Sequence, residues 1–379
     1  MGRCEARALA LAIAIAVVAP GGTAAAGDWE LEIHGGGLFT LPPSSGRVTK
    51  PPAGESFQTV APGVSSLRVT SWYFGDGGTL LQRKQPVTYT YIATSGAYQT
   101  VLPLDPVLST AAVRWPFAVG GGLRVGRRLG RRFTAELNVD YSRHAPEFSG
   151  KARADIENGR SSFDRAWSAT LSSLPGSRVT SQATVLDGSG RQLVATGVIN
   201  VNLVTGDAPK WSRRSPRRRF VNYLTLGAGI VSTRGEEANA TLVGRYRFAS
   251  PAGAPFEETD TVTVRSSRTF GTALVGVFGL GWKQDLSTHS GIRFDTRAYV
   301  GRNPTRIVMD AQPSVTTGSP AAAFVVNSSI GAIQLVNSRS GYQGQESSLS
   351  GPALAGFETF KGTGIQAQLN LTLGVFLRF

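Results

Sequence analysis

Cysteine, histidine and charge are all scarce in this sequence. Its 379 residues include one cysteine, three histidines and 17% charged residues. The histidines have no cysteines or paired acids near them, so no metal-site motif is present and we expect no cofactor. After residue 26 no run of 18 apolar residues occurs, which excludes a transmembrane helix. Glycine is abundant instead, at 46 residues, and this composition argues against a soluble helical enzyme.

The first 26 residues have the pattern of a secretory signal peptide. Arg3 and Arg7 precede an apolar run over 8–19, and small residues stand at Ala24 and Ala26. We expect cleavage before Gly27, so that 1–26 is the signal peptide and 27–379 the mature domain. The apolar run is too short for a membrane anchor, which is the alternative interpretation. Because Cys4 precedes it, the exported chain would contain no cysteine and no disulfide.

The last segment, 364–379, gives the clearest strand. Side chains on a strand point alternately to two faces, and here one face is apolar at every position from Ile365 to Phe379, whereas the other is mostly polar. Similar alternation is found in seven further segments: 29–39, 117–126, 133–143, 193–204, 220–231, 270–283 and 291–301. Without a spanning helix, only a closed barrel satisfies every backbone group in lipid. We therefore predict an all-β fold, a transmembrane antiparallel up-and-down β-barrel of eight strands.

The connections between these segments alternate in length. Short links (127–132, 205–219 and 284–290) alternate with long ones (40–116, 144–192, 232–269 and 302–363), as periplasmic turns and extracellular loops do in bacterial barrels. Within the long links, 178–186 and 191–203 flank Asp187-Gly188, a hairpin signal, and 240–248 with 259–266 form a second candidate strand pair. We interpret both as hairpins beyond the membrane. The alternative is that they enter the wall and raise the strand number to 10 or 12.

In this register the barrel interior would contain five acids and five cations. They are Glu30, Glu32, Glu136, Asp140 and Asp295, with Arg124, Lys283, Arg293, Arg297 and Arg378. An eight-stranded interior is just wide enough to be filled by side chains, and a buried charge is costly unless it is paired. The balance therefore predicts an ion-paired, closed lumen.

The end of the chain resembles the small outer-membrane barrels of the OmpA/OmpX type and the related OmpW-like proteins. The resemblance covers the signal peptide, the alternating strands and above all the final segment 373–379. In that group a last strand that ends in phenylalanine is the signal read by the barrel-assembly machinery, and Val375, Leu377 and Phe379 match it. The resemblance implies a bacterial outer-membrane location, with outer-membrane lipids and lipopolysaccharide around the barrel.

Several functions agree with this pattern. We expect a structural, surface-interaction or limited-permeability role without catalysis. A small-solute porin is one alternative. A lipid- or peptide-modifying barrel enzyme is another, since Asp140, Ser142 and His144 share a strand face, although three inward polar residues are the simpler explanation of that pattern. A soluble β-sandwich is a further alternative.

The net charge of +14 is concentrated in the short links. The expected periplasmic basic rim consists of Arg127, Arg128, Arg131, Arg132, Arg213, Arg214, Arg217, Arg218 and Arg219. Because the chain is expected to be exported, we expect no nucleic-acid partner. The rim either is solvated or contacts anionic phospholipid or peptidoglycan, because clustered cations attract anionic headgroups.

Overall fold

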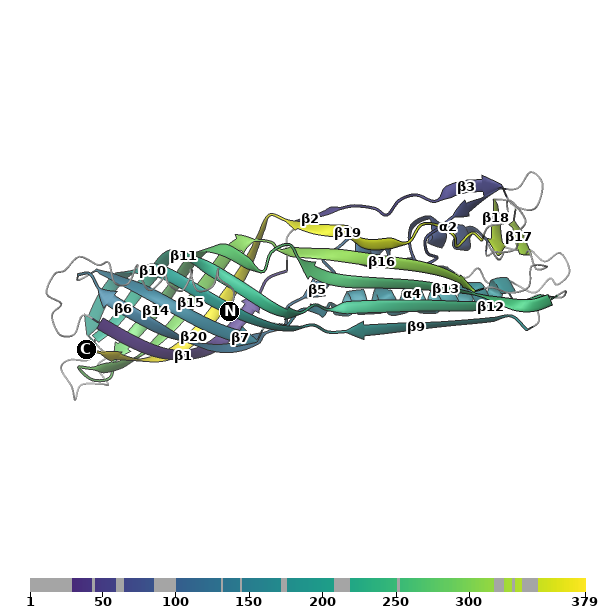
Figure 1. Ribbon diagram of the computed structural model, residues 1–379. Helices are drawn as coiled ribbons and strands as arrows, with labels where there is room; N and C mark the ends of the chain where they lie inside the picture. The colour runs from purple at the N-terminus through teal and green to yellow at the C-terminus, as the bar shows by residue number, and fades with distance from the viewer. Residues whose placement is uncertain are drawn as a thin grey trace.

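The computed structural model describes residues 29–42, 45–58, 65–84, 100–130, 132–143, 145–171, 176–207, 219–250, 253–316, 324–328, 331–335 and 347–379. Within them the molecule is elongated, with a closed barrel at one end and a sheet covered by helices at the other (Figure 1). The expected signal peptide lies outside the described residues.

Eight antiparallel strands close the barrel, which confirms the predicted fold class and strand number. They pair in the order β1-β20-β15-β14-β11-β10-β7-β6 and back to β1. Their bounds are β1 Trp29–Thr40, β6 Ala118–Arg128, β7 Phe133–Arg143, β10 Ser189–Asp207, β11 Arg219–Glu236, β14 Thr272–Asp285, β15 Ser290–Arg302 and β20 Ile365–Arg378. Trp29 and Phe379 exchange backbone hydrogen bonds, so both ends of the wall lie at the short-turn end.

Six of these strands continue beyond the barrel as a second sheet. Its order, β2-β19-β16-β13-β12-β9, repeats the order of the barrel strands β1-β20-β15-β14-β11-β10. The bounds are β2 Ser45–Val48, β9 Arg178–Leu186, β12 Asn239–Ser250, β13 Gly253–Arg268, β16 Thr305–Thr316 and β19 Leu354–Thr363. Each member thus adjoins its barrel counterpart across a short break. We call this the distal sheet.

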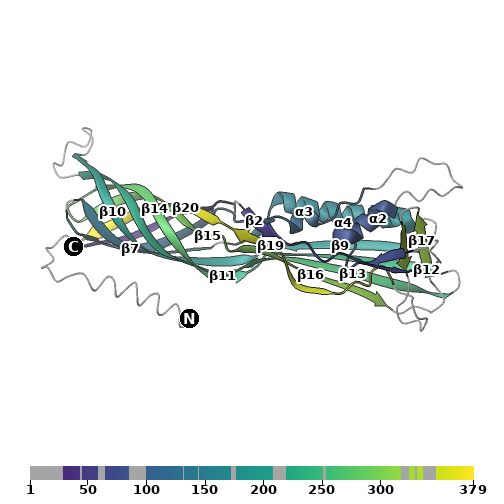
Figure 2. The ribbon, with the colours of Figure 1, turned by 90° about the horizontal axis from the view of Figure 1, so that it is seen from above.

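Helices cover one face of the distal sheet, as Figure 2 shows. The longest is α4, Gly150–Leu171, with α2 at Gly75–Lys84 and α3 at Asp105–Leu108. The Ser149 hydroxyl accepts a hydrogen bond from the Ala152 backbone N–H, which caps the start of α4. Buried residues then recur at Ala152, Ile156, Phe163 and Trp167, spacings that place them on one helix face. The distal sheet and these helices form the distal domain.

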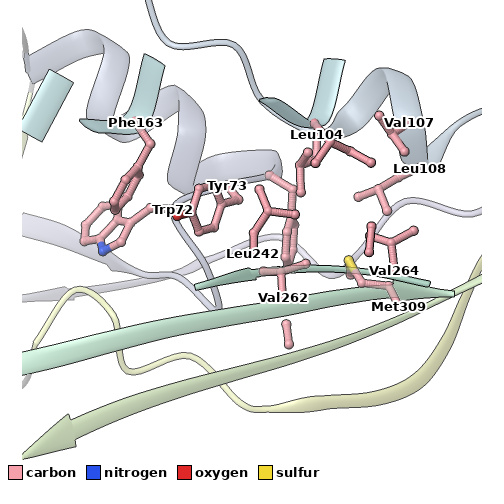
Figure 3. Packing of buried hydrophobic residues seen from close by; sticks show 14 of the residues in the cluster. Trp72, Tyr73, Leu104, Val107, Leu108, Phe163, Leu242, Val262, Val264 and Met309 are labelled. Carbon is pink, nitrogen blue, oxygen red and sulfur yellow. The ribbon is translucent and has the colours of Figure 1, made fainter. Parts of the chain in front are cut away.

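The core of the distal domain is apolar and rich in aromatic residues. Phe163 of α4, with Trp72 and Tyr73 of the segment before α2, packs over Leu242 and Val262 of the sheet (Figure 3). Trp167 lies edge-on to Trp72, with ring centroids 5.1 Å apart, and stacks on Tyr246 at 5.2 Å. Burial of such large rings is the main stabilising term for a layer of this kind.

One of the two predicted hairpins is wrong and the other is confirmed. Asp187-Gly188 does not reverse the chain, because β9 pairs with β12 whereas β10 pairs with β7 and β11. The chain instead passes from the distal sheet directly into the barrel wall. The pair 240–248 and 259–266 does form, as β12 with β13, but within the distal sheet.

Short two-stranded sheets complete the described residues. They pair β3, Glu55–Gln58, with β4, Ser65–Arg68; β5, Val113–Arg114, with β8, Glu147–Phe148; and β17, Phe324–Ser328, with β18, Gly331–Leu335. No helix in the described part of the chain is long and apolar enough to cross a membrane.

Candidate functional site

The two faces of the barrel wall differ sharply in polarity. Large apolar side chains are exposed on the outside, for example Leu274 at 80%, Ile33 at 68% and Phe278 at 53% of their surface. Alternate residues of the same strands point inward and are buried; many of them are polar, and a smaller apolar cluster that includes Val275 and Val277 lies among them. An outward apolar band around a closed barrel is the surface that lipid chains cover, so the wall has the character of a membrane-spanning barrel.

The middle of the lumen contains six charged side chains of balanced sign, which we call the central ion-pair layer. Each has at most 3% of its surface exposed: Glu32, Glu136 and Asp295, with Arg124, Arg293 and Arg297. They extend from four strands, β1, β6, β7 and β15, that surround the lumen. Three negative and three positive groups therefore share a volume from which water is excluded.

The ion pairs of this layer cross the lumen. Glu136 on β7 accepts from Arg293 Nη1 at 2.6 Å and from Arg297 Nη2 at 2.5 Å, and its Oε1 lies 3.0 Å from Arg124 Nε. Arg124 Nη1 also lies 2.5 Å from Glu32 Oε1 and 2.8 Å from Asp295 Oδ2. Each carboxylate thus contacts at least two arginines. Charge-assisted bonds of this kind compensate for the loss of hydration.

Neutral polar side chains extend the layer toward the wall. Asn200 donates to Glu136 at 2.8 Å and accepts from the Thr225 hydroxyl at 2.7 Å. Tyr223 donates to Asp295 at 2.5 Å and accepts from Arg293 Nε at 2.5 Å. These bonds hold the charged groups in one arrangement.

A second ionic layer lies nearer the short-turn end. Glu30 pairs with Lys283 and accepts from Arg378 Nη2 at 2.8 Å, and Arg378 also reaches Asp285 at 3.3 Å. Phe376, fully buried, lies beneath both cations, with ring-to-cation distances of 5.7 Å to Lys283 and 5.2 Å to Arg378. The lumen is therefore filled at this level as well.

A third layer, toward the distal domain, centres on Asp140. This carboxylate lies 2.5 Å from His34 Nε2 and accepts from Asn138 at 2.5 Å and from the Tyr299 hydroxyl at 3.1 Å. A cavity of about 20 Å³ adjoins these side chains. A water needs about 10–15 Å³ by this measure, so the space holds one water and no solute.

Glycines in the wall provide the space for these long side chains. A Cβ at Gly281 would lie 2.3 Å from the Tyr223 hydroxyl and 2.6 Å from the Phe294 carbonyl oxygen, and one at Gly374 would lie 2.4 Å from Glu32 Oε1. All three distances are too short for real contacts. The abundance of glycine noted in the sequence is thus linked, at these positions, to the packing of the interior.

All ten predicted interior charges lie inside the barrel and take part in these layers. His34 also lies in the lumen, where it contacts Asp140. It follows Glu30 and Glu32 at alternate positions of β1, and this alternation could have predicted its inward position. Ser142 is buried on the same face as Asp140, but the histidine that bonds Asp140 is His34. His144, the third member of the predicted catalytic alternative, lies outside the described residues.

The predicted assembly residues and the rim residues that the structure describes lie at the short-turn end. Val375 and Leu377 of β20 face outward, as does Phe379 directly after it, with 48–60% of their surfaces exposed. Arg127 lies over the Trp29 ring at 5.4 Å, and Arg128 and Arg132 are exposed. Arg131, Arg213, Arg214, Arg217 and Arg218 lie outside the described residues, and for Arg219 only the backbone, in β11, is described.

The distal domain contains a different buried polar site. Glu258 and Asp260 on β13 are fully buried, and both face the covering segments. Asp260 accepts from the Ser71 hydroxyl at 2.9 Å and from the Trp72 backbone N–H at 2.7 Å, whereas Glu258 accepts from the Ser347 hydroxyl at 2.5 Å. Burial raises the pKa of each carboxyl to about 7. The two acids thus attach two separate chain segments to one strand.

Among the described residues, no group of three histidine, cysteine, aspartate or glutamate side chains is arranged to hold a metal ion.

Comparison with known proteins assigns no family to the chain. No family model matches it, and no curated protein matches it. Among solved structures, the outer membrane protein OprG from Pseudomonas aeruginosa is 10% identical with a TM-score of 0.37, over 93% of this chain and 97% of that one. The monoaromatic hydrocarbon channel CymD is 8% identical with a TM-score of 0.16, over 94% and 89% of the two chains. The P. putida toluene transporter TodX is 7% identical with a TM-score of 0.17, over 94% and 91%.

Proposed function

We propose that the chain is a bacterial outer-membrane protein whose closed barrel anchors the distal domain at the cell surface. Its role would be structural or one of surface interaction, with limited permeability at most and no catalysis. The observation that carries this proposal is the central ion-pair layer, which fills the cross-section of an eight-stranded wall. A barrel of this size has no room for both such a layer and a solute path.

The arrangement of the ends supports the proposed orientation. Both ends of the described wall lie at the short-turn end, and the distal domain extends from the other. In bacterial barrels the short turns face the periplasm and the long connections face outward. The distal domain would then be extracellular, where its exposed surface is available to partners.

Conductance of the purified protein in a planar bilayer tests the closed lumen. We expect no stepwise current from the parent protein. The double variant Glu136→Ala with Arg293→Ala removes one acid and one cation from the central ion-pair layer, so it should give measurable current without a change in net charge. Asp310→Ala with Arg265→Ala, a matched pair on the distal sheet, should remain silent. A reproducible channel in the parent would favour the small-solute porin instead.

We also propose that the basic rim contacts anionic phospholipid or peptidoglycan on the periplasmic side. Each cation near an anionic surface contributes about 1 kcal/mol, an attraction that salt screens. The test is binding of the detergent-solubilised protein to anionic liposomes, zwitterionic liposomes and peptidoglycan. Changing Arg213, Arg214, Arg217, Arg218 and Arg219 to serine should weaken binding at low salt. Equal binding by variant and parent would mean that the rim is only solvated.

A further inference from the structure

Three neighbouring strands break at the junction between the barrel and the distal sheet. β13 and β14 are separated over 269–271, β15 and β16 over 303–304, and β19 and β20 at Gly364. At this level two adjoining cavities share Trp115, Thr233, Arg268 and Gly271 in their walls. The larger has a volume of about 210 Å³. We call the two together the junction cavity; it has room for a small organic molecule.

Arg268 is the central polar group of this cavity. Its side chain is half-buried and lines both parts. No described residue forms an ion pair or a side-chain hydrogen bond with its guanidinium. Burial lowers the pKa of Arg268, and the charge of Glu237 offsets part of that effect. Glu236 and Glu237 also line the larger part, but both are exposed, so water screens their charges.

Two further polar atoms in the same walls have no partner. Thr305 faces Arg268 in the register of β13 and β16, and its buried hydroxyl oxygen makes no hydrogen bond. Gln366 lines the smaller part, and its buried Nε2 makes none either. A buried polar group without a partner is costly. Hydroxyl, amide and guanidinium can all donate, so a group that accepts hydrogen bonds would suit each of them.

The remaining wall of the smaller part is largely apolar. It includes Trp115, only 8% exposed, together with Val231, Phe270, Ala273 and Val275. A ligand that fits must therefore combine an acceptor group of negative charge with an apolar body. The planar fork of a guanidinium matches the two oxygens of a carboxylate, so a carboxylate is an acceptor group that fits this cavity.

We propose that the junction cavity binds a small carboxylic acid with an aromatic or other apolar body. Arg268 holds the carboxylate, Gln366 and Thr305 donate to it, and Trp115 packs against the body. The site lies between the third lumen layer and the distal domain, so binding needs no path through the barrel. It is independent of the proposed anchoring function, because a closed lumen and an occupied junction cavity are compatible.

Isothermal titration of the full-length protein in detergent tests this proposal, with benzoate as the probe. Benzamide keeps the ring without the charge, and acetate keeps the charge without the ring. We expect saturable benzoate binding, at least tenfold tighter than either comparison compound. Arg268→Gln should weaken benzoate binding at least tenfold and remove the preference over benzamide, and Arg268→Lys should give an intermediate loss.

Arg245→Gln is the matched control, since Arg245 is exposed on the neighbouring strand β12 and lies outside the cavity walls. It should bind benzoate as the parent does. Absence of saturable benzoate binding to the parent, or parent-like binding by folded Arg268→Gln, would overturn the proposal. If Arg268→Gln does not fold, the titrations of the parent protein test the proposal. Equal affinity of the parent for benzoate and benzamide would also overturn it.

Discussion

Strands β15 and β16 follow one another along the chain, yet they turn opposite kinds of side chain inward. β15 buries Arg293, Asp295 and Arg297, whereas β16 buries Ile307 and Met309. The outward side chains show the reverse change, from apolar on the barrel to charged on the distal sheet. Phe278 and Leu280 of β14 are exposed on the barrel, but Arg245 and Arg247 are exposed on β12 of the distal sheet.

The environment outside the wall explains this inversion. A barrel in lipid must be apolar outside, so its inward residues are free to be polar provided that every charge is paired. The distal sheet has helices on one face and polar residues on the other, so its stability depends on apolar burial beneath the helices. One set of continuous strands therefore has two interiors. Ion-paired charges fill most of the barrel interior, beside a small apolar cluster, whereas the interior of the distal domain is mainly apolar. A substitution in one interior should therefore destabilise that part of the molecule.

Removal of a lumen arginine should have one of the two largest effects. Arg293→Ala leaves Glu136 and Asp295 with one cation fewer in a site without water, which should cost about 3–5 kcal/mol of barrel stability. Urea unfolding followed by gel mobility measures this loss. Arg265→Ala, which breaks the exposed pair with Asp310, should cost less than about 1 kcal/mol. Equal losses would contradict an ionic interior.

Truncation of a core ring should affect the distal domain alone. Trp167→Ala removes the side chain that contacts both Trp72 and Tyr246, at a cost of about 3–5 kcal/mol. We expect protease sensitivity and loss of near-UV circular dichroism from this domain, while the barrel keeps its gel mobility. Arg165→Ala, exposed on the same helix, is the control and should have no effect. Loss of barrel mobility with Trp167→Ala would mean that the two interiors are not separate.

Acidity should strengthen the distal domain. The pKa values of Glu258 and Asp260 are raised to about 7 in the folded protein, above their unfolded values. Their neutral forms are thus favoured by folding, so stability is highest below the unfolded pKa and is lost as pH rises toward 7. Each group should contribute about 2 kcal/mol more at pH 5 than at pH 7. Urea titrations of tryptophan fluorescence at both values measure this, and Asp260→Asn should reduce the difference.

The sequence predicted the barrel well because lipid imposes a strict pattern. Alternation identified eight strands and the inward position of all ten charges. It did not identify their partners, since Arg124 of β6 and Arg293 of β15 both reach Glu136 across the lumen. Such contacts depend on the closed shape of the barrel and not on spacing along one strand.

The distal sheet was harder to predict because its strands continue those of the barrel. Asp187-Gly188 has the composition of a hairpin turn, but here it separates β9 from β10. The apolar side chains face inward on β9 and mostly outward on β10. Helix α4 did leave a signal, with Ser149 as cap and apolar residues at helical spacing from Ile156 to Trp167. The apolar pattern of this helix is less regular because Gly159 and Ser162, which are not large apolar residues, are also buried.

Spin-label accessibility along β13 and β14 tests the inversion most directly. The expected mature chain has no cysteine, so single cysteines can be placed at Thr261, Val262, Val277 and Phe278 of the protein in bilayers. The account predicts that a label at Phe278 is accessible to oxygen from the lipid, one at Thr261 to an aqueous nickel complex, and labels at Val262 and Val277 to neither. Oxygen accessibility at Val277 would contradict the account. Outward labels on β13 and β14 that are accessible to the same reagent would contradict it as well.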